Sequence, residues 1–208
     1  MSSPSLATDA WVLYKKPPAE TFQTFVVFSA EQGHLTILKR ISRKPAPTQP
    51  AIDLFDEASL LLENRDQGPS WFIREVRLLT RFAAIGRTYD SLRLASAFAA
   101  LVCRNQVGHD SRTKLYALLR TSLAAFAGEA PPEVVYFKSI YCFARDEGYP
   151  MKQQWLPSLP QPLLDHAISL LKSPLAALPE DAGNHPNLVE LQDRLNNFLR
   201  GHTDVLVD

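Results

Sequence analysis

The sequence has little of what metalloproteins and most enzymes need. It contains only two cysteines, Cys103 and Cys142, which lie in separate apolar runs and are expected to be buried packing thiols. Two such cysteines cannot form a structural zinc site without histidine ligands. The five histidines are scattered, and none has the spacing of a metal-binding or catalytic pair. We therefore expect no metal, no cofactor and no enzymatic activity.

Several other signals are missing as well. No segment matches the glycine-rich phosphate-binding motifs or the Gly-x-Ser-x-Gly nucleophile motif. No apolar run approaches the roughly 18 residues that span a bilayer, and residues 1–11 do not resemble a signal peptide. We expect a cytoplasmic protein that contacts no membrane. Because 22 basic residues balance 22 acidic ones, the net charge is zero, and any binding of nucleic acid needs a local basic patch.

A β-hairpin is the clearest pattern that is present. Residues 22–44 read FQTFVVFSAEQGHLTILKRISRK, two β-rich runs joined by a short turn that contains Gly33. Gly33 fits the turn position that needs a positive φ. The second arm ends in Lys39, Arg40, Arg43 and Lys44 with no acid among them. These cations are able to neutralise phosphates along a groove, or to guard a strand edge against aggregation.

Three more strands are expected around the hairpin. Residues 10–14 form a first strand that ends before Pro17, and residues 52–63 form a fourth, with a bend at Asp56. The run at 71–82, WFIREVRLLTRF, fits a helix or a strand; we favour a strand through Arg77 because the earlier strands need a closing partner. Five strands within residues 1–82 predict a small barrel.

The period of the apolar residues changes after Gly86. Helices are predicted from a Thr88 cap to about 105, from an Asp110 or Ser111 cap to Gly128, and over 132–147, 162–171 and 186–200. Residues 149–160 hold three prolines and are expected to form an extended loop. Trp155 within it either plugs the helical bundle or marks a contact surface. The chain thus reads as α+β, with a strand domain at 1–82 and an all-helical domain at 83–208.

This order, with the residues that carry it, resembles the bacterial recombination mediator RecO family. The matching segments are FVVFSAEQG, GHLTILKRISRK, LFDEASLLLE and WFIREVRLL in the strand half, then TYDSLRLASAFAALV and FKSIYCFARDEGYP in the helical half. Many family members carry a four-cysteine zinc site after the last of these segments. Here that region reads MKQQWLPSLPQP and has no cysteine, so the resemblance implies no zinc.

The resemblance implies an N-terminal five-stranded OB-fold barrel, a C-terminal helical domain and a non-enzymatic role in DNA repair. Family members bind single- and double-stranded DNA, anneal complementary strands and help to load the recombinase on DNA coated by single-strand-binding protein. Their partners are RecR and the acidic C-terminal tail of the single-strand-binding protein. The neutral charge and the missing cysteines favour a second hypothesis, a protein-interaction module with weak or no DNA binding.

Basic residues in the strand half are the candidate DNA ligands. Arg74, Arg77 and Arg81 recur at helical spacing, whereas on a regular strand Arg77 and Arg81 share a face that excludes Arg74. The candidate DNA-binding residues are Lys15, Lys16, Lys39, Arg40, Arg43, Lys44, Arg74 and Arg77. The aromatic residues Phe22, Phe25, Phe28 and Trp71 are able to stack on bases or to fill the barrel core.

Two further groups of polar residues have more than one interpretation. Arg112, Lys114 and Arg120 on the second predicted helix suit the carboxylates of an acidic partner peptide, or form a solvated helix face. Asp53, Asp56 and Glu57 are close in sequence, which fits an exposed bulge as well as a metal site.

Overall fold

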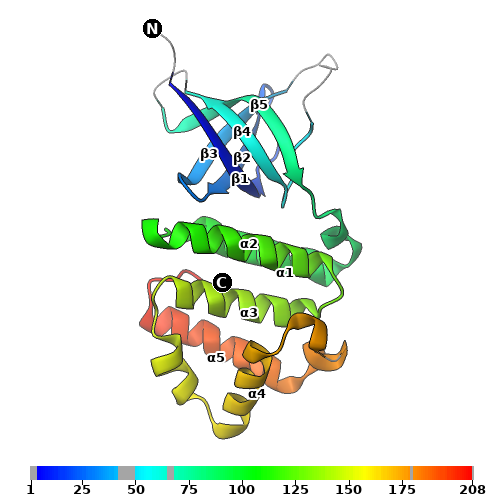
Figure 1. Cartoon of the computed structure of the whole chain (residues 1–208), viewed down its shortest axis with the longest axis vertical. Coiled ribbons are helices and arrows are strands. Elements are labelled where there is room, and N and C mark those ends of the chain that lie inside the picture. Colours follow the sequence, from blue (N-terminus) through cyan, green and yellow to red (C-terminus); the bar gives the residue numbers. More distant parts are fainter. Residues whose placement is uncertain (1–3, 42–49, 65–67, 179, 208) are drawn as a thin grey trace. The chain divides into compact units, whose positions relative to one another are not determined.

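The chain divides into two compact units, Met1–Phe82 and Ala83–Asp208. In a computed structural model, residues 4–41, 50–64, 68–178 and 180–207 are described. The first unit, the strand unit, carries a five-stranded sheet, and the second, the helical unit, carries the α-helices (Figure 1). The predicted α+β class, with the sheet before the helices, is confirmed.

The sheet of the strand unit closes on itself. Its strands follow the order β1-β2-β3-β5-β4, and β1 pairs with β4 to complete the ring. Every pairing is antiparallel except that of β3 with β5, which is parallel. The strands are β1 (Ser5–Lys15), β2 (Phe22–Ser29), β3 (Gly33–Arg40), β4 (Glu57–Glu63) and β5 (Ser70–Thr80).

The hairpin of β2 and β3 forms where the sequence predicts it. Ser29 pairs with Gly33 across the turn, and Gly33 has a φ of 71°, in the left-handed region that glycine tolerates best. β1 is longer than predicted: it begins at Ser5 and pairs with β4 along most of its length. The sequence pattern did not predict this part of the strand, because the polar residues Ser5, Thr8 and Asp9 interrupt the apolar run.

Apolar residues that alternate along the strands fill the inside of the ring. Val12, Phe25, Val27, Ile37 and Leu60 are buried there, together with residues from every strand. Trp71 and Ile73 of β5 are partly buried and pack against this cluster. The predicted strand at 71–77 is therefore confirmed, and it extends to Thr80.

The predicted strand at 52–63 is wrong in its first part. β4 begins only at Glu57, and residues 50–56, here called the return segment, form no strand. Phe55 has a φ of 68°, which is unusual for a bulky side chain. Asp56 explains the interruption: its side chain is buried and accepts a hydrogen bond from Asp53 N at 2.7 Å, which forms a turn that a strand cannot contain.

Asp56 is held by Arg81, which follows the end of β5. Arg81 Nε lies 2.9 Å from Asp56 Oδ1, and Arg81 Nη2 lies 2.6 Å from Oδ2, so the pair is bidentate. Arg81 Nη2 also donates to the carbonyl of Ala51. The next acid, Glu57, is buried as well and accepts a hydrogen bond from Thr80 Oγ1. The interpretation of these acids as an exposed bulge is therefore wrong for Asp56 and Glu57, whereas Asp53 is exposed.

The helical unit is organised around one central helix. The α-helices are α1 (Tyr89–Arg104), α2 (Arg112–Ala127), α3 (Pro132–Asp146), α4 (Gln161–Lys172) and α5 (Pro186–His202). α3 contacts each of the other four and buries Phe137, Ile140 and Phe143. Thr88 caps α1 by accepting a hydrogen bond from Ser91 N, as predicted. Neither Asp110 nor Ser111 caps α2 by its side chain; the Ser111 hydroxyl donates to the carbonyl of Asp146 instead.

The expected extended loop at 149–160 is wrong. Met151–Trp155 forms a π-helical turn, and a 3-10 turn follows at Leu156–Ser158. Trp155 is buried against the rings of Phe137 and Tyr141, so it plugs the helical bundle. Burying this large ring stabilises the compact turns that the prolines alone would not favour.

The two cysteines are only partly buried, which corrects their prediction as buried thiols. Burial still raises the pKa of Cys103 to about 11, and it raises the pKa of Cys142 as well. Both side chains are therefore neutral thiols near pH 7. Within the described ranges, no helix combines the length and the apolar character that crossing a membrane requires.

The Asp56–Arg81 pair predicts a clear loss of stability. Arg81→Met leaves the buried Asp56 carboxylate without its partner, so we expect the free energy of unfolding to fall by about 3 kcal/mol. Urea denaturation followed by circular dichroism measures the change. Arg77→Met is the matched control because Arg77 is exposed on β5, four residues before Arg81, and it should cost less than about 0.5 kcal/mol. Equal stability of the two variants would contradict the structural role.

Candidate nucleic-acid interface

The outer face of β2, β3 and β5 carries an aromatic pair. Phe22 of β2 lies opposite Arg40 of β3, and Leu38 of β3 lies opposite Phe72 of β5. The rings of Phe22 and Phe72 meet edge to face, with centroids 5.6 Å apart and planes at 65°. Both side chains are half-buried. They alternate with core residues, so they face outward and form a small apolar platform on the sheet.

A bulge in β5 brings Arg74 to this outer face. Leu61 of β4 pairs with Glu75, whereas the next residue, Leu62, pairs with Ile73, so Arg74 is the extra residue. An extra residue inverts the alternation of side chains along a strand. Ile73 and Val76 consequently both pack on the core, while Arg74 and Arg77 are both exposed on the outside. The expectation that a strand would separate Arg74 from Arg77 is therefore wrong.

Arg40 and Lys39, at the end of β3, differ in environment. Arg40 is exposed and lies beside the aromatic platform, opposite Phe22. Lys39 alternates with Arg40 and is half-buried; its Nζ donates to the carbonyl of Pro50 at 3.1 Å. Burial lowers the pKa of Lys39. Arg43 and Lys44, the other cations of this group, lie outside the described residues.

Lys15 and Lys16 flank β2 on the side away from β3. Lys15 pairs with Phe25 in the register of β1 and β2, and its Nζ forms an ion pair with Asp53 at 3.0 Å. Lys16 is exposed, and its backbone N donates to the carbonyl of Thr24. The Gln23 amide donates to the carbonyl of Lys16. Lys16, directly after the end of β1, is thus tied to β2 through its backbone.

Three cations converge on the return segment at 50–56. Lys39 reaches Pro50, Lys15 reaches Asp53, and Arg81 reaches Ala51 and Asp56. Their contacts are structural, since each joins a strand or strand end to the same stretch of chain. Of the predicted DNA ligands that the structure describes, Arg40 and Arg74 lie beside the aromatic platform, Lys16 lies next to the start of β2, and Arg77 lies further along β5.

The predicted stacking residues are corrected in part. Phe25 and Phe28 are buried, so they cannot stack on a base, and Trp71 packs against the core cluster. Phe22 remains at the surface. Its ring partner Phe72 was not predicted. The alternation of 71–77 indicated that Phe72 lies on the face opposite Trp71 and Ile73. The parallel pairing that brings β5 next to β3 is not visible in the sequence.

The three candidate partner residues on α2 do not form one cluster. Arg112 is half-buried, Lys114 and Arg120 are exposed, and the guanidinium of Arg120 lies over the ring of Tyr116 at 6.0 Å. At 100° per residue, their positions spread around the helix. Lys114 alone shares a face with Leu118 and Thr121, which border a hollow of about 140 Å³ between α2 and α3.

Lys138 lies at that hollow, and sequence reasoning missed it. Its Nζ donates to the carbonyls of Leu170 and Ser173 at the end of α4, at 3.0 and 2.7 Å. Burial lowers the pKa of Lys138. The sequence feature that could have identified Lys138 is its place as a single lysine within the apolar stripe of α3. Such a cation needs hydrogen-bond acceptors within the fold.

No metal cluster is found where the structure describes the chain: no group of three or more potential ligand side chains is suitably placed. Comparison with known proteins adds no relative, since no family model matches the chain and no curated protein matches it in sequence.

The Lys15–Asp53 pair predicts a measurable pKa. Burial alone would raise the pKa of Asp53, but hydrogen bonds from Lys15 Nζ and Leu54 N outweigh it, helped by nearby positive charge, and the pKa is lowered. The stability that this pair contributes is present above about pH 3.9, the pKa of an unfolded aspartate, and is lost as pH falls through the folded pKa.

Lys15→Met should therefore raise the pKa of Asp53 toward its ordinary value, which NMR titration of the Asp53 carboxyl carbon measures. Because the pair is exposed, the loss of stability at pH 7 should stay below about 1 kcal/mol. Lys16→Met is the control and should leave the Asp53 pKa in place. An unchanged pKa in Lys15→Met would show that the ion pair does not form in solution.

Proposed function

We propose that this protein is a RecO-like recombination mediator that binds DNA through an N-terminal OB-fold barrel. In this proposal it has no enzymatic activity, anneals complementary strands and assists recombinase loading on DNA coated by single-strand-binding protein. Its partners are RecR and the tail of the single-strand-binding protein. The observation that carries the proposal is the outer face of β2, β3 and β5, where the Phe22 and Phe72 rings meet, Arg40 of β3 lies opposite Phe22, and Arg74 follows Phe72 by two residues on β5.

The strand order supports the OB-fold assignment. Five strands close into a ring with one parallel contact, between β3 and β5. OB-folds are small five-stranded Greek-key barrels that bind oligonucleotides on the face of strands 2 and 3. The aromatic platform lies on that face and extends to β5. It combines the two elements of sequence-independent single-strand binding, a surface on which bases stack and cations that contact the backbone.

The charge distribution determines how strong this binding is. The net charge is zero, and Lys15, Lys39 and Arg81 hold the return segment. Affinity for DNA then depends on a few cations near the platform, and it should decline steeply with salt. About four phosphate contacts to a single strand correspond to a log–log salt slope of about −3.

Charge reversal tests the cationic part of this site. We expect Arg40→Glu combined with Arg74→Glu to reduce the slope from about −3 to about −1.5, since each lost phosphate contact removes about 0.7. Fluorescence anisotropy of a labelled oligothymidylate, titrated at several salt concentrations, measures it. Arg93→Glu with Lys114→Glu is the matched control, because both residues are exposed on the helical unit. Equal slopes for the two double variants would rule out this face as the DNA site.

Truncation of one ring tests the stacking part. Phe72→Ala should weaken binding of the same oligonucleotide at least fivefold, because stacking contributes about 1–3 kcal/mol per base. The salt slope should stay unchanged, which separates stacking from phosphate contacts. Tyr89→Ala, which removes an exposed ring from α1, should have no effect on affinity. A Phe72→Ala variant that binds as tightly as the original protein would contradict the platform.

A protein-interaction module remains the second candidate function. The structural use of Lys15 and Lys39 favours it, because these cations already have partners within the strand unit. Such a module would co-purify with RecR or with the single-strand-binding tail and show no salt-dependent DNA binding. Strand annealing measured with the intact protein separates the two candidates.

A further inference from the structure

The chain after α5 leaves the helix at Thr203, whose backbone is extended (φ −142°, ψ 169°), and its next residues lie against the helical unit. Thr203 turns it back: its hydroxyl donates to the carbonyl of Leu199 at 2.6 Å and accepts a hydrogen bond from Val205 N at 3.1 Å. Exposure then alternates along residues 204–207. Asp204 and Leu206 are exposed, Val205 is buried and Val207 is half-buried. One side of this segment therefore faces the protein, as one side of a β-strand would.

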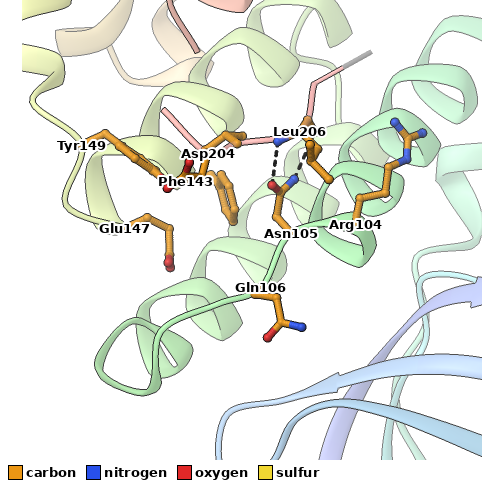
Figure 2. A pocket seen from close by; sticks show the side chains of 9 residues that line it. Arg104, Asn105, Gln106, Phe143, Glu147, Tyr149, Asp204 and Leu206 are labelled. Atoms are coloured by element: carbon orange, nitrogen blue, oxygen red, sulfur yellow. Dashed lines mark hydrogen bonds between the residues drawn. The ribbon is translucent and has the colours of Figure 1, made fainter. Parts of the chain in front are cut away.

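Asn105, at the end of α1, binds the main chain of this segment. Its Oδ1 accepts a hydrogen bond from Leu206 N at 2.8 Å, and its Nδ2 donates to the carbonyl of Leu206 at 3.1 Å, as Figure 2 shows. Nδ2 also donates to the carbonyl of Leu101 at 2.7 Å, which fixes the orientation of the amide. Asn105 is only 6% exposed. A buried amide thus reads both hydrogen-bonding groups of one residue, in the way a neighbouring β-strand does.

A cavity of about 270 Å³ adjoins the segment. Phe143, Glu147 and Tyr149 line it from the end of α3, and Asp204 and Leu206 line it from the segment (Figure 2). Glu147 is oriented by a hydrogen bond from Gly108 N at 3.3 Å. The groove around Asn105 is therefore wider than the segment that lies in it. Aromatic and polar side chains line the space that the segment leaves unfilled.

We propose that this groove is a peptide-recognition site in which residues 203–207 act as an intramolecular ligand. The ligand class is an extended polypeptide with apolar side chains at alternate positions, because Val205 is buried and Val207 is half-buried while Asn105 binds the main chain of Leu206 between them. An extended segment of a partner protein with this apolar-x-apolar pattern takes the place of residues 203–207. The site is independent of the DNA-binding face and lies wholly within the helical unit.

The contacts of the bound segment are few, which makes it displaceable. It offers one buried side chain and the two hydrogen bonds of Leu206, and the Leu206 side chain itself is 59% exposed. Ordering the residues of the segment opposes these contacts. The segment stays bound chiefly because it is attached, which gives it a high effective concentration at the groove. A free peptide therefore binds measurably once the attached segment is released.

Two variants of the full chain release the segment and leave the groove intact. Leu206→Pro removes the N–H that donates to Asn105, and Val205→Asp places a carboxylate at the buried apolar position. The probe is a fluorescein-labelled peptide of residues 201–207 with an amidated end, followed by fluorescence anisotropy. We expect each release variant to bind this probe at least tenfold more tightly than the original chain, in which the attached segment competes.

Changes in the probe show whether recognition follows the proposed contacts, without altering the protein. A probe methylated on the nitrogen of Leu206 cannot donate to Asn105, and a probe with Val205→Asp cannot fill the apolar position. Both should bind at least tenfold more weakly to the release variants. The proposal is overturned if neither release variant binds the original probe, or if the methylated probe binds as well as the original.

Discussion

The ion pair between the buried Asp56 and the partly exposed Arg81 is the contact on which the strand unit depends. A carboxylate inside a fold is costly unless its charge is balanced and its oxygens are hydrogen-bonded. Arg81 and the backbone of Asp53 meet both needs, and Arg81 also binds the carbonyl of Ala51. The pair thereby connects the end of β5 to the chain that enters β4. These two strands are neighbours in the closed ring, so the pair links the end of one to the start of the other.

Other cations of the strand unit also contact the return segment. Lys15 and Lys39 hold the return segment from β1 and β3, as Arg81 does from the end of β5. Arg40 and Arg74 instead lie beside the Phe22–Phe72 pair, one opposite Phe22 and one at the β5 bulge. The cations of the strand unit therefore fall into two groups: Lys15, Lys39 and Arg81 contact the return segment, and Arg40 and Arg74 lie beside the aromatic pair on the outer face of the sheet.

Local patterns predicted the elements that depend on local physics. Alternation and Gly33 predicted the hairpin, and Thr88 predicted the start of α1. Most of the failures involve partners distant in the chain. Ile52 and its neighbours resemble a strand until Arg81 binds Asp56, and residues 149–160 resemble a loop until Trp155 packs against Phe137. The outward position of Arg74 follows from a one-residue register shift against β4, which no pattern within β5 records.

In both units, a buried side chain binds main-chain groups that would otherwise pair with another strand. In the strand unit, Asp56 accepts from Asp53 N and interrupts a sequence that would otherwise continue as a strand. In the helical unit, the Asn105 amide binds both the N–H and the carbonyl of Leu206, as a neighbouring strand would. Each side chain is buried, so each must find its partners within the protein. The partners of Asp56 belong to the return segment and to the end of β5, within the same unit, which makes that contact permanent. The partner of Asn105 is a short segment near the end of the chain, and any extended main chain offers the same two groups. That difference distinguishes a structural contact from a binding site.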